Sequence, residues 1–124
     1  MNKKLNKVLK EIQQQNIPGH WFISGSVGRE LKGISTKHND INIKADEKTL
    51  NLFKHLIKTG IISRDFPIDL EKKKDDYIWF TFIERNNGLN VLSLENQLSR
   101  YETIEGRQWK AEQIRNFLNR RKLK

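Results

Sequence analysis

The sequence predicts an α/β protein of the α+β type, with a small mixed sheet of four or five strands flanked by three or four helices. Two segments, about residues 3–15 and 106–121, repeat apolar residues at helical spacing and carry basic residues on the other side. Between them, short apolar or alternating runs are separated by Gly and Asn turns, which is typical of strands. With 124 residues and no internal repeat, the chain is expected to form a single domain over residues 1–124.

The first helix is predicted over residues 3–15. Its apolar residues recur at i, i+3, i+4 and i+7, which places them on one side: Leu5, Val8, Leu9 and Ile12. Pro18-Gly19 then ends the connection and starts the first strand near His20.

Residues 21–43 are the most informative stretch. Residues 21–23 form a continuous apolar run, as expected of a strand covered on both faces. Gly25-Ser26 follows as a turn that presents a backbone amide and a hydroxyl at the start of a short helix, where anions are favoured. The next strand, residues 40–44, alternates polar and apolar residues, so Asp40 and Asn42 share one face.

A third helix is predicted after Asp46, a suitable N-cap, and ends at Gly60. Ile61-Ile62 could form a third short strand, and residues 66–68 a connection or an edge strand. The charged residues 71–76 indicate an exposed loop.

A hairpin is predicted next. Residues 77–84 are rich in aromatic and β-branched residues, Asn87-Gly88 is a strong turn signal, and residues 89–94 form the returning strand. A loop of two residues would place Arg85 opposite Asn90. The last helix, residues 106–121, is expected to turn four residues inward: Ala111, Ile114, Phe117 and Leu118.

Composition excludes several classes of protein. Hydrophobic residues make up 35% of the chain, mean hydropathy is −0.77, and no apolar run approaches the roughly 20 residues of a membrane span. The chain has no cysteine, so disulfides and thiolate chemistry are excluded. A cytoplasmic protein that does not associate with membranes is expected.

The net charge of +9 is concentrated at the ends. Residues 1–11 carry +3 and residues 100–124 carry +5, in the two terminal segments that contain the predicted helices. These basic helices could attract nucleic acid through its phosphates, or they could be ordinary solvated helix surfaces.

Three segments together resemble the nucleotidyltransferase superfamily, and most of all its aminoglycoside and lincosamide (minimal nucleotidyltransferase) branch. They are Gly25-Ser26, the run His38-Asn39-Asp40-Ile41-Asn42-Ile43, and the hairpin ending Gly88-Leu89-Asn90-Val91. The resemblance covers about residues 17–95. It implies that a nucleoside monophosphate passes from ATP or another nucleoside triphosphate to a hydroxyl acceptor, with Mg²⁺ held by three carboxylates.

The resemblance also implies a role for individual residues. Gly25 and Ser26 would contact the phosphates, and Asp40, Asn42 and Asn90 would occupy the three positions of the metal-binding catalytic acids. Arg29 could reach the polyphosphate, and His38 is an accessory candidate.

Each of these residues also has an ordinary interpretation: a simple turn for Gly25-Ser26, a strand start for Asp40, a solvated helix residue for Arg29, and a surface histidine for His38.

Two of the three expected carboxylates are amides in this sequence. An amide oxygen can ligate a cation but adds no negative charge, and losing one transition-state-stabilising group commonly costs ~10²–10³ in rate. The sequence therefore predicts a nucleotidyltransferase fold whose catalysis is impaired or lost, with Asp40 the one remaining metal ligand. An active enzyme would have to recruit another acid, for which four candidates exist: Asp46, Asp69, Glu84 and Glu95.

Three functions remain open from the sequence. The first is an active nucleotidyltransferase. The second is a non-catalytic module that binds a nucleotide or a protein partner, including a second copy in a homodimer. The third is a nucleic-acid-binding module that uses the basic terminal helices.

Overall fold

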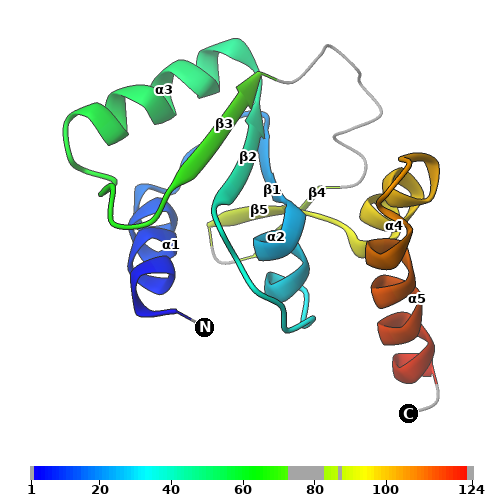
Figure 1. The fold of residues 1–124 in the computed structure, drawn as a ribbon. Coiled ribbons are helices and arrows are strands. Elements are labelled where there is room, and N and C mark those ends of the chain that lie inside the picture. The colour runs from blue at the N-terminus through cyan, green and yellow to red at the C-terminus, as the bar shows by residue number, and fades with distance from the viewer. Residues whose placement is uncertain (1, 73–82, 87, 123–124) are drawn as a thin grey trace.

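The computed structural model describes residues 2–72, 83–86 and 88–122. The described elements are, in chain order, α1 (Lys3–Gln15), β1 (Trp21–Ser24), α2 (Gly25–Leu31), β2 (Ile41–Ala45), α3 (Glu47–Lys58), β3 (Ile68–Lys72), β4 (Ile83–Asn86), β5 (Leu89–Leu92), α4 (Leu94–Thr103) and α5 (Gln108–Lys122). Figure 1 shows the sheet at the centre, α1 and α3 together at one side, and the α4–α5 hairpin at the other.

The sheet is mixed, with strand order β3-β2-β1-β5-β4. Strand β1 is antiparallel to β2 and parallel to β5, while β3 is parallel to β2 and β4 is antiparallel to β5. This arrangement confirms the predicted fold class. The described residues form five helices, against the three or four expected, because α4 was not predicted.

The main core lies between the sheet and helices α1 and α3. The four apolar residues predicted to line one side of the first helix are all buried there, and the bounds of α1 match the prediction. Trp21 on β1 is fully buried; its indole N–H donates to the carbonyl of Ile17 at 2.9 Å, and its ring meets that of Phe53 edge-on at 5.1 Å between centroids. Such paired aromatic burial fixes α3 against the sheet.

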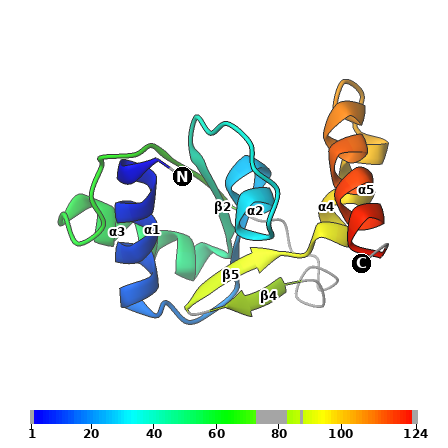
Figure 2. The same cartoon turned by 90° about the horizontal axis from the view of Figure 1, so that it is seen from below.

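A smaller cluster holds the α4–α5 hairpin. Ile34, just after α2, is buried with Leu94 of α4 and Ile114 of α5. Seen from below, the hairpin stands beside the sheet and away from α1 and α3 (Figure 2). Ala111 and Ile114 are buried as predicted, and Phe117 and Leu118 are partly buried.

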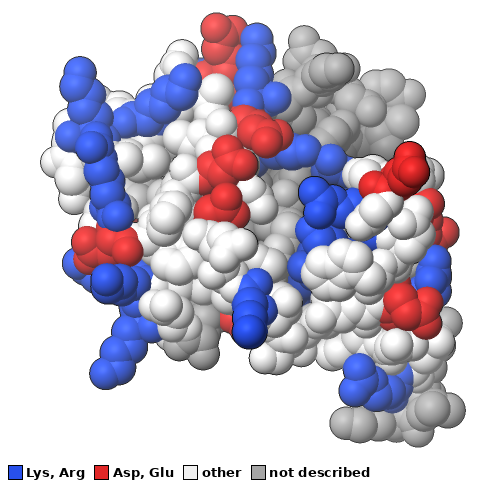
Figure 3. All heavy atoms as spheres, viewed as in Figure 1, with Lys and Arg blue, Asp and Glu red and all other residues white. Residues whose placement is uncertain are grey.

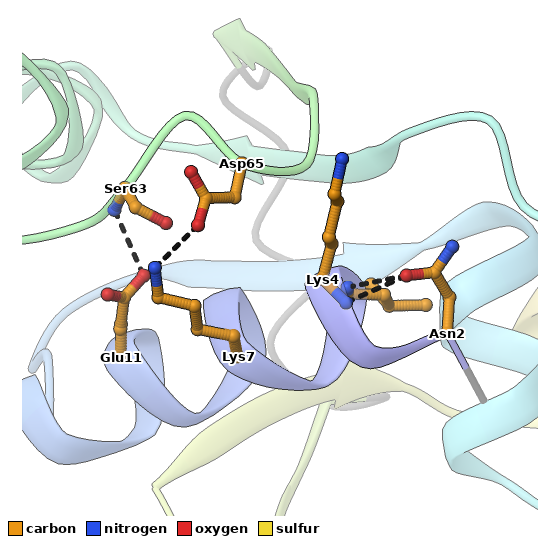
Figure 4. Close-up of polar contacts among 7 residues, drawn as sticks. Asn2, Lys4, Lys7, Glu11, Ser63 and Asp65 are labelled. Atoms are coloured by element: carbon orange, nitrogen blue, oxygen red, sulfur yellow. Dashed lines mark hydrogen bonds and ion pairs between the residues drawn. The ribbon is translucent and has the colours of Figure 1, made fainter.

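The segment between α3 and β3 is fastened to α1. Lys7 Nζ contacts Asp65 Oδ2, and Glu11 Oε1 accepts a hydrogen bond from the backbone N–H of Ser63 at 3.0 Å (Figure 4). The contact with Asp65 raises the pKa of Lys7, and the contact with Lys7 lowers that of Asp65. These contacts fix the approach to β3, which carries residues of the candidate site.

The predicted third strand is wrong in position. Ile61-Ile62 is not a strand; Ile62 is buried, and its backbone N–H donates to the carbonyl of Leu56 at 3.0 Å. The third strand is β3, which begins after Pro67 and includes residues 71–72, where a loop was predicted. The rest of that loop, residues 73–76, lies outside the described residues.

The predicted β-hairpin is described in part. Residues 77–82 of its predicted first strand and Asn87 of its predicted turn lie outside the described residues. The register of β4 and β5 confirms the predicted pairing of Arg85 with Asn90. The returning strand ends at Leu92, and α4 begins at Leu94 with Ser93 as its cap. No helix within the described ranges is long and apolar enough to cross a membrane.

Candidate functional site

The turn after β1 is built around Gly25. This residue begins α2 with a φ of +69°, a left-handed conformation that favours glycine. A Cβ atom at position 25 would lie 2.5 Å from Nδ2 of Asn42, so space also excludes a side chain. Because Ser24 pairs with Asn42 across β1 and β2, the Asn42 amide packs directly against this turn.

Strands β2 and β3 present a polar face beside the turn. Asn42 pairs with Asp69, and Lys44 pairs with Glu71, while Ile41 and Ile43 point into the core. Neighbouring strands lie about 4.8 Å apart, so Asn42 and Asp69 are immediate neighbours. Lys44 Nζ lies 3.8 Å from Glu71 Oε2, so one of the two acids on β3 is already partly neutralised.

The opposite wall is basic and comes from α4, α5 and the turn between them. Figure 3 shows acidic side chains over β3 and a group of basic side chains on the facing side of the hairpin. The two walls enclose an open cleft lined by Ser24, Gly25, Asn42, Ile43, Lys44, Asp69, Glu71, Arg100, Tyr101, Arg107 and Lys110. The cleft therefore has acidic groups suited to a cation on one wall and basic groups suited to an anion on the other.

Burial and neighbouring cations lower the pKa of two lysines that line the cleft. Burial, and then the charge of Arg100, lowers the pKa of Lys44. Burial, and then the charges of Arg107 and Arg29, lowers the pKa of Lys110. A negatively charged ligand in the cleft would relieve this mutual repulsion.

Arg29 is buried and contacts the basic wall through Tyr101. It is only 1% exposed; its Nη1 donates to the Tyr101 hydroxyl at 3.0 Å, and its Nε to Gln113 Oε1 at 3.1 Å. Burial lowers the pKa of Arg29, although Tyr101 acts in the opposite direction. Arg29 is not among the cleft-lining residues, so the structure does not place it in the direct phosphate contact that was predicted.

Ser26, His38 and Glu30 form a chain of polar contacts. His38 Nδ1 lies 2.9 Å from Ser26 Oγ, and His38 Nε2 lies 2.9 Å from Glu30 Oε2, although the latter contact lacks good hydrogen-bond alignment. The His38 side chain is only 7% exposed, so it is not a surface histidine. It ties the segment before β2 to α2, and it engages the Ser26 hydroxyl that was predicted to contact phosphate.

Asp40 lies just before β2 and is half-buried. One residue separates it from Asn42, so both lie at the same end of β2. The backbone N–H of Ile41 donates to the carbonyl of Pro67 at 2.9 Å and holds this end of β2 beside the start of β3. Asp40 itself is not among the cleft-lining residues.

Asn90 does not join this group, contrary to the predicted convergence. It lies on β5, with β1 between β5 and β2, and it is buried. Its amide oxygen accepts a hydrogen bond from Arg85 Nη1 at 2.8 Å. The acid that the structure places next to Asn42 is Asp69, which is missing from the predicted triad because β3 was not recognised as a strand.

The donor set does not fit a three-carboxylate metal centre. Among the residues that the structure describes, no group of three or more His, Asp or Glu residues is arranged to hold a metal ion. The Asn42 amide occupies the position between the turn and Asp69 where a second carboxylate was expected.

Two signals in the sequence could have revealed the missed part of the site. Residues 68–71 alternate apolar and acidic residues, which is the pattern of a half-buried strand. Ser93 caps α4 by accepting a hydrogen bond from the backbone N–H of Asn96 at 3.2 Å, and such a serine before an apolar residue is typical of a helix start. Helix α4 supplies Arg100 and Tyr101 to the cleft.

Comparison with known proteins supports the fold. No protein-family model matches the chain, and no curated protein matches its sequence. The crystal structure of a provisionally assigned nucleotidyltransferase from Thermotoga maritima superposes with a TM-score of 0.67 and 20% sequence identity, covering 97% of this chain and 96% of that one. The chain therefore has a nucleotidyltransferase-like fold along almost its whole length.

Proposed function

We propose that the cleft between the β2–β3 face and the α4–α5 hairpin binds a nucleoside triphosphate such as ATP, and that nucleotidyl transfer at this site is impaired or lost. The likeness of fold to a provisionally assigned nucleotidyltransferase supports nucleotide chemistry. The proposal includes a relationship to the aminoglycoside and lincosamide branch, because the residues at Gly25-Ser26 and Asp40 resemble its motifs.

One observation carries the proposal: the amide of Asn42 packs against the Gly25 turn and beside Asp69, at the centre of the acidic wall. A hard divalent cation prefers clustered anionic oxygens, and an amide contributes an oxygen without charge. Mg²⁺, if bound, would neutralise charge on the phosphates. The residues present do not fit a three-carboxylate centre, so no catalytic step is assigned to the metal.

The chain's own residues suit phosphate binding better than phosphoryl chemistry. Lys44, Arg100, Arg107 and Lys110 line the cleft and outnumber Asp69 and Glu71, the two acids that line it. Cationic side chains held in a partly buried cleft attract polyphosphates without a bridging metal. Binding that depends little on Mg²⁺ follows from this balance of charge.

The proposal is tested by pyrophosphate release from each of the four nucleoside triphosphates with a panel of hydroxyl acceptors and Mg²⁺. The wild type is expected to release pyrophosphate at background rate, and Asn42→Asp is expected to raise that rate. Asp40→Ala, made in the Asn42→Asp background, should return the rate to background. Rapid release by the wild type would refute the loss of catalysis, and no nucleotide binding in a parallel thermal-shift panel would refute the function altogether.

A further inference from the structure

Lys110 lies close to two aromatic rings. Its Nζ lies 5.4 Å from the centroid of Tyr101 and 5.4 Å from that of Trp109. Both distances are within the range of cation–π attraction, so the rings orient the ammonium group. Because Lys110 also lines the cleft, its charge is directed there by a built arrangement of side chains.

Three cations near Tyr101 have no acidic partner among the residues that the structure describes. Among the described residues, no carboxylate lies within ion-pair distance of Arg29, Arg107 or Lys110. Arg115, on the same helix as Lys110, differs: it meets Glu112 at 2.8 Å and Glu102 at 3.8 Å. Within the described part of the chain, Arg115 of α5 is therefore paired with acids, whereas Arg107 and Lys110, which line the cleft, are not.

The burial of Arg29 makes the lack of an acid more costly. Arg29 as a whole is 1% exposed, and among the described residues its guanidinium donates only to the neutral groups of Tyr101 and Gln113. Buried charges are normally paired with an opposite charge, because desolvation is expensive. An anion bound beside Lys110 would supply the missing charge to the whole group.

Within the described ranges, Trp109 is the most exposed of the large apolar residues, with 58% of its surface accessible. Trp109 does not line the cleft itself, but its ring lies 5.4 Å from the Nζ of Lys110, which does. The cleft has a volume of about 200 Å³, below the roughly 300–1,000 Å³ typical of sites that enclose a whole small molecule. Phosphate groups therefore fit inside, and the rest of a nucleotide would extend towards the rim.

We propose that the α4–α5 hairpin binds a nucleoside polyphosphate, with Arg107 and Lys110 holding the phosphates and the exposed ring of Trp109 stacking on the base. This inference rests on the proposed function and adds which wall of the cleft holds the ligand. Stacking uses the face that every base possesses, so the site discriminates little among bases. ATP, GTP and UTP should bind within about threefold of one another.

Isothermal titration of tripolyphosphate and of ATP, both in EDTA, separates the two contacts. The wild type should bind both ligands, with ATP tighter by ~5-fold or more because of stacking. Lys110→Met should weaken both by about tenfold, the worth of one charge-assisted hydrogen bond. Trp109→Ala should weaken ATP towards the level of tripolyphosphate and affect tripolyphosphate far less, because the Tyr101 ring still lies beside Lys110.

Matched variants test whether the effects are specific. Arg120→Met removes one positive charge from an exposed part of α5 outside the cleft, and it should change neither affinity by more than about twofold. Lys110→Arg and Trp109→Phe should each restore part of the lost affinity, because they keep the charge and the aromatic face.

These experiments distinguish failure of this inference from failure of the proposed function. If the wild type binds ATP but Lys110→Met and Trp109→Ala leave that affinity unchanged, this inference is overturned and nucleotide binding stands. If the wild type binds neither ATP nor tripolyphosphate, both are overturned. If a thymidylate 15-mer binds more tightly than ATP at the same salt and loses that affinity in Lys110→Met, the hairpin serves nucleic acid, and the inference is again overturned.

Discussion

Replacing Asn42 with Asp should raise the affinity of the cleft for Mg²⁺. The change preserves shape, so the close packing of this side chain against Gly25 is retained. It adds one negative charge next to Asp69, its neighbour in register on β3. The variant therefore tests whether position 42 governs the affinity of the cleft for Mg²⁺.

The magnitude follows from Coulomb's law. Two unit charges 4 Å apart interact by about 1 kcal/mol in water, so a carboxylate attracts a divalent ion at that distance by about 2 kcal/mol. That energy corresponds to a gain of ~30-fold in Mg²⁺ affinity. Without metal, the new carboxylate repels Asp69 by about 1 kcal/mol, so Asn42→Asp should melt at a lower temperature than the wild type in EDTA.

Thermal shift and isothermal titration with MgCl₂ measure both effects. The melting temperature of Asn42→Asp should fall in EDTA and recover as Mg²⁺ is added, whereas that of the wild type should change little. Asn90→Asp is the matched control, because it makes the same amide-to-acid change at the other amide. Its carboxylate would pair with Arg85, which already donates to Asn90 at 2.8 Å, so its Mg²⁺ affinity should stay at the wild-type level.

Two results would refute this reasoning. Equal gains in Mg²⁺ affinity by Asn42→Asp and Asn90→Asp would show that residue 90 belongs to the metal-binding position after all. No gain by Asn42→Asp would show that Asn42 and Asp69 do not face one site.

Further substitutions test the turn, a helix cap and the basic wall. Gly25→Ala should lower the free energy of unfolding, measured in urea, by ~1–3 kcal/mol, because of its positive φ and its contact with Asn42; an unchanged value would contradict the geometry of the turn. Asp46→Ala should cost about 1 kcal/mol at pH 7 through loss of the N-cap. Burial acts to raise the pKa of Asp46, but hydrogen bonds from Thr49 hold that pKa below its usual value. The cost of Asp46→Ala should therefore shrink as the pH falls through the lowered pKa. A cost that persists at lower pH would show that the cap does not depend on the charge of Asp46. Lys110→Met should raise the melting temperature of the ligand-free protein at pH 7, because burial and two nearby arginines lower the pKa of Lys110 and its charged form destabilises the fold. The gain should fade as the pH rises through that lowered pKa and the wild type loses the proton, and a lower melting temperature at pH 7 would contradict the crowding of charge.

The local parts of the fold could be predicted from the sequence. The apolar spacing in residues 3–15 gave the bounds of α1, and Asp46 caps α3 as expected. The turn signal at Asn87-Gly88 was sufficient to predict the pairing of Arg85 with Asn90. Each of these features depends on residues close together in the chain, where side-chain spacing and turn chemistry decide the structure.

Strand β3 was not placed from the sequence, although residues 68–71 alternate as a half-buried strand does. Pro67 lacks a backbone donor and marks its segment as an edge or a connection, although its carbonyl accepts from Ile41 in the structure. The strand forms through parallel pairing with β2, a contact between segments more than 20 residues apart. Without β3, Asp69 had no neighbour, and Asn90 was assigned to the position beside Asn42 by the resemblance alone.

The basic wall of the cleft depends on a second long-range contact. Helix α4 has a serine cap and partly apolar spacing, but its position beside the sheet is set by packing of Leu94 and Ile114 on Ile34. Arg29 is buried for the same reason, since α4 and α5 cover it. The charge of the terminal segment was evident from composition, whereas its direction towards the cleft was not.

Titration of ATP into the wild-type protein, once in EDTA and once in excess Mg²⁺, would test most directly whether cations rather than metal-bridged carboxylates hold the nucleotide. We expect binding in both buffers, with affinities within about threefold, because Arg107 and Lys110 supply the positive charge. Binding that requires Mg²⁺ and is lost in EDTA would contradict this.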